Sequence, residues 1–429
     1  MKTENRALAG WGNFPVANAQ VAEPESVAEL ATFVRQREPA LTTRGNGRSY
    51  GDAALGSCVL SMLRLNRILA FDATTGEIAC EAGVLLDDIL KLTLPHGWFF
   101  HVTPGTRFVT VGGAIAADVH GKNHQTAGCF SNWLISIELM NGDGQILTCS
   151  PTENAALFWQ TCGGMGWTGV ILSARFQLRK IPSGTVLQTT RRAESLDKIF
   201  AAFESAADRE YNAAWLDCTA RGAGFGRGVL LSGDHWPSDG GAGFPKIENT
   251  RLRNVPFFAP RWLLNSVVIR AHNAWFWLKK RPETQQISLE KYFFPLDSLQ
   301  NWNRLYGRRG FVQYQFCLPE ATAPEGIARV LETVQAGRDL PFLSVLKRHG
   351  ERPPQAVHSF PIRGFSLALD FPRTATVLGL VEKLDEVVWQ FGGKIYLAKD
   401  ACSAPKMSRI SPASFGEAKF SSLQKQRIS

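Results

Sequence analysis

The chain has 429 residues, of which 45% are hydrophobic and 20% charged, and its formal net charge is +9. This composition is typical of a globular protein with a large core, and it excludes a disordered chain. A positive charge suits a nucleic acid, an anionic lipid surface or a phosphorylated substrate, but the sequence has no helix-turn-helix pattern, zinc-finger spacing or basic tail, so we expect no nucleic-acid partner.

The first part of the chain predicts a mixture of strands and helices. Ser26, with Glu29 three residues later, has the pattern of a helix N-cap, so a helix is expected over 23–36. The turn Asn-Gly-Asp-Gly at 141–144 lies between two alternating apolar arms and predicts a β-hairpin. The same patterns predict strands at 40–43, 58–63, 77–83 and 170–181, and helices at 85–97 and 154–162.

After about residue 182 the pattern predicts an α+β arrangement, in which helices pack on one face of a sheet. We divide the chain into domains over 1–180 and 181–395 and a C-terminal segment over 396–429 that returns to the first domain. In the second domain we expect strands at 212–220, 226–235, 286–297, 310–319, 342–350 and 364–372, helices at 195–211, 325–337 and 374–392, and a loop at 236–250.

The segment 255–281 is rich in aromatic residues and is interrupted by cations at Arg261, Arg270, Lys279 and Lys280. It fits an amphipathic stretch at a membrane interface. It fits equally well a core helix whose cations reach past apolar neighbours to water.

Eight cysteines are widely spaced and none forms a Cys-x-x-Cys pair, so we expect reduced thiols and a cytoplasmic protein. The first residues lack the apolar centre of a signal peptide. No apolar run approaches the roughly 20 residues of a membrane-spanning helix.

Four clusters of small residues occur in the first domain, at 44–52, 103–106, 110–123 and 163–171. Glycine permits positive φ and lets backbone amides approach an anion closely. The first cluster, RGNGRSYGD, matches neither a Walker loop nor a dinucleotide fingerprint, and by itself it fits a phosphate cradle and a surface loop equally well. Together the four clusters indicate a backbone that passes close to a large flat ligand.

The motifs RGNGRSYGD, EAGVLLDDIL, HVTPGTRFVTVGGAIAADVHGKNH, NGDGQIL and GGMGWTGVI, in this order, resemble the FAD-binding domain of the vanillyl-alcohol oxidase superfamily over about 10–180. The resemblance implies a two-domain α+β fold, with a second domain built on an antiparallel sheet, and FAD as cofactor. The first loop has Arg48 near the place where covalent members carry a histidine, so we expect non-covalent FAD. The implied cofactor-binding residues are Arg44, Gly45, Asn46, Gly47, Arg48, Ser49, Tyr50, Pro104, Gly105, Thr106, Gly112, Gly113, Gly121, Asn123, Gly166, Val170 and Lys399.

The motifs PGTRFVTVGGAIAADVHGKNH, AAWLD, YFFPLD, FVQYQF, FLSVLKRHG, LALDFP and GGKIYLAKD resemble more closely the members that oxidise a polyprenyl-phosphoryl pentose. This implies oxidation of the ribose 2′-hydroxyl to a ketone, during synthesis of an arabinose donor for the cell envelope. The implied partners are a lipid-linked sugar phosphate, a short-chain reductase that acts on the keto product, and a peripheral contact with the inner membrane. The implied catalytic residues are Lys399 and His120, and the substrate-binding residues are Lys122, Trp215, Tyr292, Gln313, Gln315 and Lys347.

Several alternatives stay open at this point. Lys399 could stabilise developing negative charge or, with a lowered pKa, accept the hydroxyl proton. The substrate could instead be a free sugar, an alditol or an aldonolactone, and a flavin-binding protein without turnover is a third alternative. Two positions depart from the closer group: Ala368 replaces a cysteine that covalent nitroaromatic inhibitors trap, and Ser366 replaces an asparagine. We therefore expect no covalent capture here.

Overall fold

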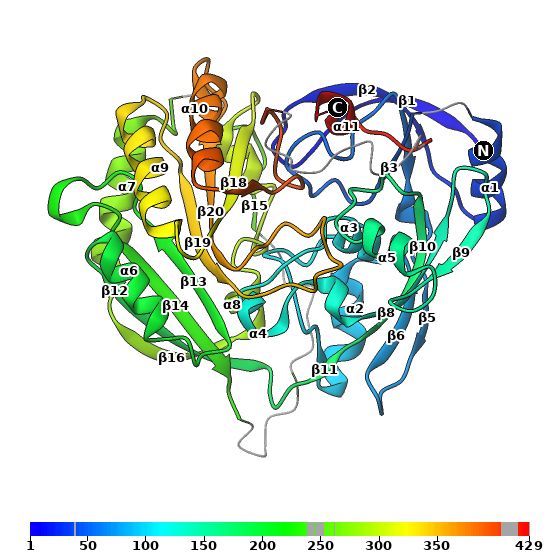
Figure 1. The fold of residues 1–429 in the computed structure, drawn as a ribbon, viewed down its shortest axis with the longest axis horizontal. Coiled ribbons are helices and arrows are strands. Elements are labelled where there is room, and N and C mark those ends of the chain that lie inside the picture. Colours follow the sequence, from blue (N-terminus) through cyan, green and yellow to red (C-terminus); the bar gives the residue numbers. More distant parts are fainter. Residues whose placement is uncertain (38–39, 238–243, 245–252, 261, 405–418, 429) are drawn as a thin grey trace.

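The structure is a computed structural model that describes residues 1–37, 40–237, 244, 253–260, 262–404 and 419–428. Two halves lie side by side, with the sheets of the N-terminal half on one side and one large sheet on the other (Figure 1). Within the described ranges, no helix is both long enough and apolar enough to cross a membrane.

The N-terminal half contains two sheets, with strand orders β1-β2-β4-β3 and β5-β6-β10-β8-β9. The expected hairpin is confirmed, because β8 and β9 pair in antiparallel fashion across residues 141–145. The strands are β1 (Thr3–Ala9), β2 (Val16–Ala22), β3 (Leu41–Arg44), β4 (Cys58–Ser61), β5 (Ile68–Phe71), β6 (Glu77–Glu81), β8 (Leu134–Met140), β9 (Ile146–Cys149) and β10 (Val170–Gln177). A short pair, β7 (Trp98–Phe99) with β11 (Arg179–Lys180), lies beside them.

Five helices among the described residues belong to this half. The expected N-cap is confirmed, since the Ser26 hydroxyl accepts a hydrogen bond from the backbone N–H of Glu29 at the start of α1. The helices are α1 (Val27–Gln36), α2 (Leu86–Thr93), α3 (Val111–Ala116), α4 (His124–Ala127) and α5 (Ala155–Thr161).

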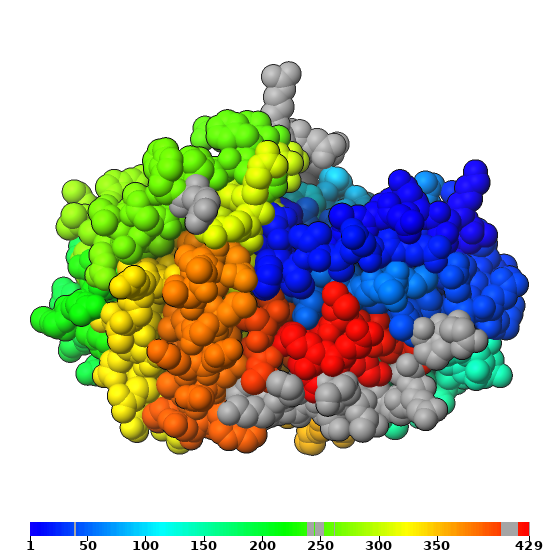
Figure 2. All heavy atoms as spheres, turned by 90° about the horizontal axis from the view of Figure 1, so that it is seen from above, coloured from blue at the N-terminus to red at the C-terminus, as the bar shows by residue number. Residues whose placement is uncertain are grey.

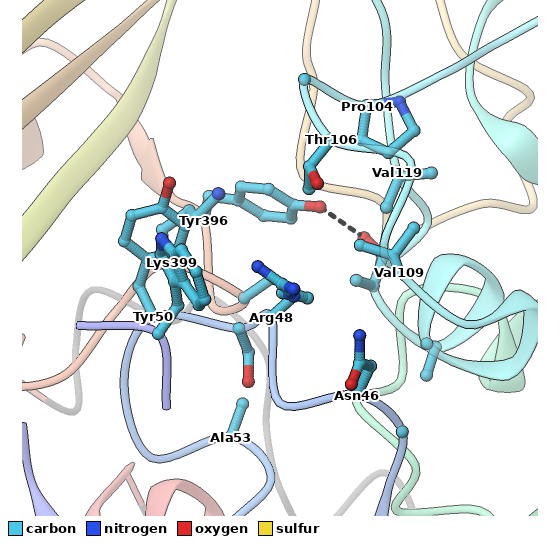
Figure 3. A pocket seen from close by; sticks show the side chains of 18 of the residues that line it. Asn46, Arg48, Tyr50, Ala53, Pro104, Thr106, Val109, Val119, Tyr396 and Lys399 are labelled. Carbon is cyan, nitrogen blue, oxygen red and sulfur yellow. Dashed lines mark hydrogen bonds between the residues drawn. The ribbon is translucent and has the colours of Figure 1, made fainter. Parts of the chain in front are cut away.

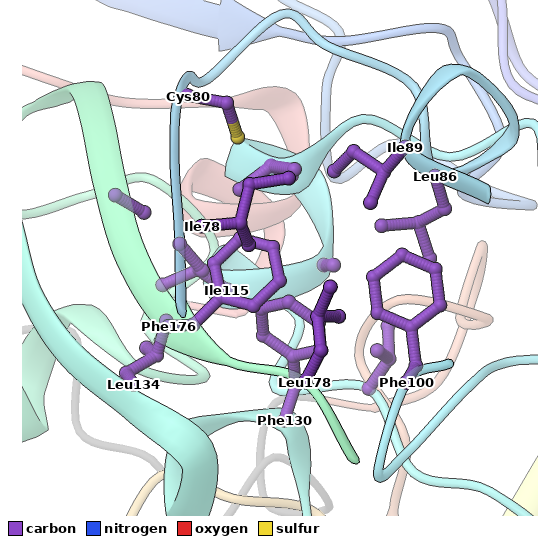
Figure 4. Close-up of a cluster of buried hydrophobic side chains, with 14 of the residues drawn as sticks. Ile78, Cys80, Leu86, Ile89, Phe100, Ile115, Phe130, Leu134, Phe176 and Leu178 are labelled. Atoms are coloured by element: carbon purple, nitrogen blue, oxygen red, sulfur yellow. The ribbon is translucent and has the colours of Figure 1, made fainter. Parts of the chain in front are cut away.

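The core of this half lies between the second sheet and helices α2 and α3 (Figure 4). Ile115 of α3 is fully buried there, among the rings of Phe100, Phe130 and Phe176. Removing this apolar surface from water stabilises the position of α3. Because Ile115 faces the core, the glycine side of the same helix is left to face the middle of the molecule.

The second half is built on one antiparallel sheet with the order β16-β12-β14-β13-β19-β20-β18-β21. Together with the mixed N-terminal half, it confirms the expected α+β class. Its strands are β12 (Thr185–Ala193), β13 (Tyr211–Leu216), β14 (Gly228–His235), β16 (Glu283–Ser288), β18 (Phe311–Pro319), β19 (Leu343–His349), β20 (Gly364–Pro372) and β21 (Lys394–Ile395), and a small parallel pair joins β15 (Arg253–Asn254) to β17 (Leu299–Gln300).

Helices cover the outer face of the large sheet and leave the inner face toward the N-terminal half (Figure 1). On β18, Val312, Tyr314 and Phe316 point into the core beneath those helices, while Gln313 and Gln315 alternate with them on the inner face. The helices of this half are α6 (Leu196–Glu204), α7 (Ser266–Lys279), α8 (Leu289–Phe293), α9 (Ala323–Ala336) and α10 (Val377–Gln390).

One expected element is wrong. The strand expected over 286–297 ends at Ser288, where α8 begins. The Ser288 hydroxyl accepts a hydrogen bond from the Lys291 N–H and caps the helix, and Leu289, Tyr292 and Phe293, at helical spacing, are all buried. The local cap and burial of these apolar residues override the strand pattern.

The end of the chain lies against the N-terminal half. The helix α11 (Leu423–Ile428) begins where the Leu423 N–H donates to the Leu55 carbonyl, at 2.7 Å. Arg427 pairs with Asp52 and Asp400, so it joins the first loop to the segment that follows the large sheet. Residues 405–418 of the expected C-terminal segment, most of the expected loop at 236–250, and Arg261 lie outside the described residues.

Candidate active site

A cavity of about 380 Å³ lies between the two halves, which is within the usual size range of small-ligand sites. One wall consists of the four glycine clusters, and the other is the inner face of the large sheet. In Figure 3, Tyr50 and Lys399 stand on one side of this space and Pro104, Thr106 and Val109 on the other, and the Tyr396 hydroxyl reaches across to donate to the Ala117 carbonyl. Sequence segments more than 300 residues apart therefore form one site.

The first glycine loop passes very close to its neighbours. A Cβ added at Gly45 would lie 2.2 Å from the Thr110 Oγ1, so only glycine fits there. Gly47 has a φ of +62°, which favours glycine. The same Thr110 oxygen accepts a hydrogen bond from the Gly113 N–H and caps α3. The loop and the start of α3 are thus held together at the cavity wall.

Two arginines of this loop have different surroundings. The Arg44 guanidinium donates to the Ala9 carbonyl at 2.7 Å and to the Ala54 carbonyl at 3.2 Å, so it ties the loop to the N-terminal strands. The Arg48 guanidinium lies 4.1 Å from the ring centroid of Trp11 and faces the cavity. Arg48 is therefore the cation of this loop that is available to an anionic ligand.

These residues fit FAD. Glycine backbone at Gly45, Gly112 and Gly166 lines the wall, and a Cβ at any of the three would come within 3 Å of another atom. By contrast, a Cβ at Gly105 would meet nothing within 4 Å, because this glycine borders open space. A bare, flat wall beside Arg48 suits a planar ring system joined to a pyrophosphate.

Across the cavity, strand register places the polar residues of the sheet in rows. Ala368 of β20 lies between Gln315 and Val345, and Asp370 lies between Gln313 and Leu343. Ser366 lies beside Lys347. All eight side chains line the cavity. This wall offers amides, a carboxyl group and a cation that can bind the hydroxyls and charge of a polar ligand.

Three lysines border the same space. Burial lowers the pKa of Lys122 to about 7 and that of Lys347 to about 8. Burial also lowers the pKa of Lys399, while it raises the pKa of Asp370, and each of these two groups favours the charged form of the other. The Lys399 Nζ lies 3.6 Å from the ring centroid of Tyr50.

His120 connects the two walls. Its Nε2 lies 3.2 Å from the Gln315 Nε2, and its Nδ1 has no partner among the described groups. Burial, followed by the nearby charge of Lys347, lowers the pKa of His120 well below its ordinary value, so the ring is neutral near pH 7. His349 lies behind it at 5.1 Å between ring centroids and bonds to Ser366 at 2.6 Å.

Four residues expected in the site do not line the cavity. Asn123 donates to the His101 carbonyl at 2.8 Å, and Gly121 lies beside it. Tyr292 is buried under Lys122, whose Nζ is 4.2 Å from its ring centroid and donates to its carbonyl oxygen. Trp215 packs on Phe276 of α7 at 4.6 Å between ring centroids. Tyr292 thus packs beneath Lys122, and Trp215 lies beside Val345 on the neighbouring strand, so both contact a cavity residue without lining the cavity themselves.

Two carboxyl groups in the site were missed by the sequence analysis. Asp297 lines the cavity, and its Oδ2 accepts a hydrogen bond from the Arg107 N–H at 2.8 Å. Asp370 also lines it and is hydrogen-bonded by Gln313. Each is the acidic residue in a mostly apolar motif, YFFPLD or LALDFP, and that contrast was the available signal.

Comparison with known proteins agrees with this geometry. Residues 15–150 match the family model of the FAD binding domain. The chain is 35% identical to decaprenylphosphoryl-β-D-ribose oxidase of Mycolicibacterium smegmatis over 414 residues, covering 93% of this chain and 90% of the relative.

More distant relatives match a smaller part. L-gulonolactone oxidase of Mus musculus is 30% identical over 42% of this chain and 40% of its own length. Cytokinin dehydrogenase 9 of Oryza sativa subsp. japonica is 33% identical over 41% of this chain and 36% of its own length. The FAD cofactor and the two-domain vanillyl-alcohol oxidase fold are thereby confirmed. The chain belongs to the decaprenylphosphoryl-β-D-ribose oxidase family and is an FAD-dependent oxidoreductase that acts on CH–OH groups.

Proposed function

We propose that this protein oxidises the 2′-hydroxyl of a polyprenyl-phosphoryl ribose to the ketone. The observation that carries this proposal is the inner face of the sheet, where Gln313, Gln315 and Lys347 face the glycine wall across one cavity. No described carboxylate lies within ion-pair distance of Lys347, so its charge is available to an anionic sugar derivative.

Bound FAD supplies the two-electron acceptor for this oxidation, and the residues that would hold it are Arg48 and the glycine backbone around Gly45, Gly105, Gly112 and Gly166. Oxidation of the alcohol also releases the hydroxyl proton. Lys399 is the group that we assign to accept it, because burial lowers its pKa and so makes the neutral amine available.

The remaining residues bind and orient the sugar. The side-chain amides of Gln313 and Gln315 alternate on one strand face and can each bond to a hydroxyl. His120, held by Gln315, is a neutral ring that can form one hydrogen bond to the reacting hydroxyl. Lys122 and Lys347 meet the phosphate.

The keto product of the proposed reaction indicates which class of enzyme must act next. A 2-keto sugar still linked to its lipid becomes an epimer only by reduction, so we assign a short-chain reductase as the enzyme that consumes it. The relative in M. smegmatis, whose printed name specifies decaprenylphosphoryl-ribose, supports the same substrate class.

The test is product analysis with purified protein. Incubation with farnesyl-phosphoryl ribose and an electron acceptor should yield a product lighter by two hydrogens, and borodeuteride should place deuterium at C2′. Free ribose, an alditol and an aldonolactone are the comparison substrates. Turnover of these and not of the lipid-linked sugar would overturn the proposal and favour an oxidase of free sugars.

A further inference from the structure

The helix α7 packs against the protein along a narrow stripe. Ile269, Asn273 and Trp277, four residues apart, are buried, and the Asn273 side chain donates to the Asp217 Oδ1 at 3.2 Å. The Arg192 guanidinium lies 4.0 Å from the ring centroid of Trp277 on the same side. This stripe fixes the helix firmly, and therefore it also fixes which residues face outward.

The outward face of α7 is apolar. Val267, Trp275 and Leu278 are 72%, 54% and 71% exposed, and helical spacing places them opposite the buried stripe. Two aromatic residues before the helix, Phe257 and Trp262, are 68% and 69% exposed. So many large apolar side chains on one short segment indicate a surface that contacts another apolar phase.

The same segment carries only positive charge. Its described residues include Arg253, Arg270, Lys279, Lys280 and Arg281, and none of the described residues over 253–281 is Asp or Glu. On α7 the cations Arg270 and Lys279 lie at the two sides of the apolar face. An apolar strip between cations matches the interface of a membrane that contains anionic lipid.

This surface adjoins the cavity. Phe276 of α7 packs on Trp215, which pairs with Val345, and Val345 both lines the cavity and is 36% exposed. Leu264 packs against the cluster of Trp302, another cavity residue. In Figure 2 the yellow-green chain of this region lies on the outer surface of the second half.

We propose that residues 253–281 dock the protein on an anionic lipid surface. The outer face of α7, with Phe257 and Trp262, enters the headgroup region, and the flanking cations contact lipid phosphates. The benefit to catalysis rests on the proposed function, since a polyprenyl-linked sugar would enter the adjoining cavity directly from the lipid surface. The docking itself needs no substrate and is tested without one.

The experiment is co-sedimentation of the FAD-loaded protein with vesicles. We expect binding to vesicles of equal parts phosphatidylglycerol and phosphatidylcholine, and much weaker binding to phosphatidylcholine alone or at high salt. The triple variant Trp262→Ser, Trp275→Ser, Leu278→Ser should lose roughly tenfold or more in vesicle affinity. The triple variant Arg270→Gln, Lys279→Gln, Lys280→Gln should lose roughly 100-fold, on anionic vesicles only.

A matched control removes equally exposed apolar residues elsewhere. Val16, Leu69 and Ile146 are 64%, 53% and 49% exposed on the N-terminal half, and their triple serine variant should bind vesicles as the unchanged protein does. Equal binding by the Trp262, Trp275, Leu278 variant and this control would overturn the proposal. So would absence of anionic vesicle binding by the unchanged protein, including the case in which the segment instead binds a protein partner.

Failure of the proposed function is distinguishable from failure of docking. Flavin content and turnover of a water-soluble short-chain substrate should be unchanged in the docking variants. Vesicle binding without any turnover would contradict the proposed substrate and leave the docking surface intact, whereas turnover without vesicle binding would contradict only the docking.

Discussion

Gln315 Nε2 lies 3.2 Å from His120 Nε2, although the two residues are 195 positions apart in the chain. Gln315 belongs to β18 of the large sheet, and His120 follows α3 of the N-terminal half. The contact therefore joins the two walls of the cavity and fixes the orientation of the imidazole at the place where they meet.

Replacing Gln315 with leucine should remove this orientation. Gln315→Leu is expected to lower kcat by roughly 10²-fold, because a misplaced imidazole no longer holds the reacting hydroxyl in the productive position. Steady-state kinetics with separate kcat and KM values check this, with flavin content and Tm as controls for folding. A variant with normal kcat and only a raised KM would mean that Gln315 acts solely by binding substrate and does not position His120.

The two roles of Lys399 can be separated by charge. Lys399→Met removes both the cation and the base, while Lys399→Arg keeps a positive charge that does not dissociate near neutral pH. If Lys399 accepts the proton, both variants should lose roughly 10²-fold or more in kcat. Substantial activity in the arginine variant would instead assign Lys399 to charge stabilisation.

The pH dependence follows from the same assignment. The neutral amine is the active form, so kcat should rise with pH through the pKa of Lys399 and fall as pH drops below it. Burial lowers this pKa from its ordinary value of 10.5, which places the midpoint below 10.5. The pH profile of kcat measures it, and a rate that falls as pH rises through this range would contradict the assignment.

Two glycines of the wall provide a matched pair. Gly45→Ala places a Cβ 2.2 Å from the Thr110 oxygen that caps α3, and it should lower the free energy of unfolding by about 1–3 kcal/mol. Gly105→Ala meets nothing within 4 Å and should fold normally. The added Cβ enters the cavity, however, so the affinity of the Gly105→Ala variant for FAD should fall. Denaturant unfolding and FAD titration separate the two effects, and equal behaviour of the variants would contradict this account of the wall.

The flavin should be released on unfolding. The first loop contains no histidine, so no covalent link is expected there. Denaturation in guanidinium followed by ultrafiltration should place the yellow colour in the filtrate. Colour that stays with the chain would contradict non-covalent binding.

Ala368 should leave the protein resistant to covalent capture by nitroaromatic inhibitors. It faces the cavity between Gln315 and Val345, and none of the described cysteines lines that cavity. After turnover in the presence of a nitroaromatic inhibitor, mass spectrometry of the intact protein should show no inhibitor adduct, whereas the Ala368→Cys variant should form one. An adduct on the unchanged chain would refute the prediction.

Much of the fold was predictable because it depends on local chemistry. Ser26 with Glu29 specified a helix start, and residues 141–144 specified a hairpin turn. The glycine clusters were also recognisable, since a backbone that closely approaches a ligand requires glycine whatever the position of that ligand in the fold. The helix α8 was missed because Leu289, Tyr292 and Phe293 suit a strand as well as a helix until the Ser288 cap decides between them.

The composition of the site was less predictable, because it depends on register. Whether Trp215 or its neighbour Val345 reaches the cavity is decided by the pairing of β13 with β19 and by the position of α7, which no local pattern encodes. Asp370 enters the site for a similar reason, through its pairing with Gln313. The sequence motifs could therefore name residues of the site, but they could not show which of these residues contact one another.

We propose that FAD and a lipid-linked sugar meet in the cavity between the glycine wall and the sheet. The most direct measurement is the visible spectrum of the purified protein before and after anaerobic addition of farnesyl-phosphoryl ribose. We expect a flavin absorption band that this substrate bleaches and that free ribose does not. A protein that binds no FAD, or a flavin band that the lipid-linked sugar leaves unchanged, would contradict this arrangement of cofactor and substrate.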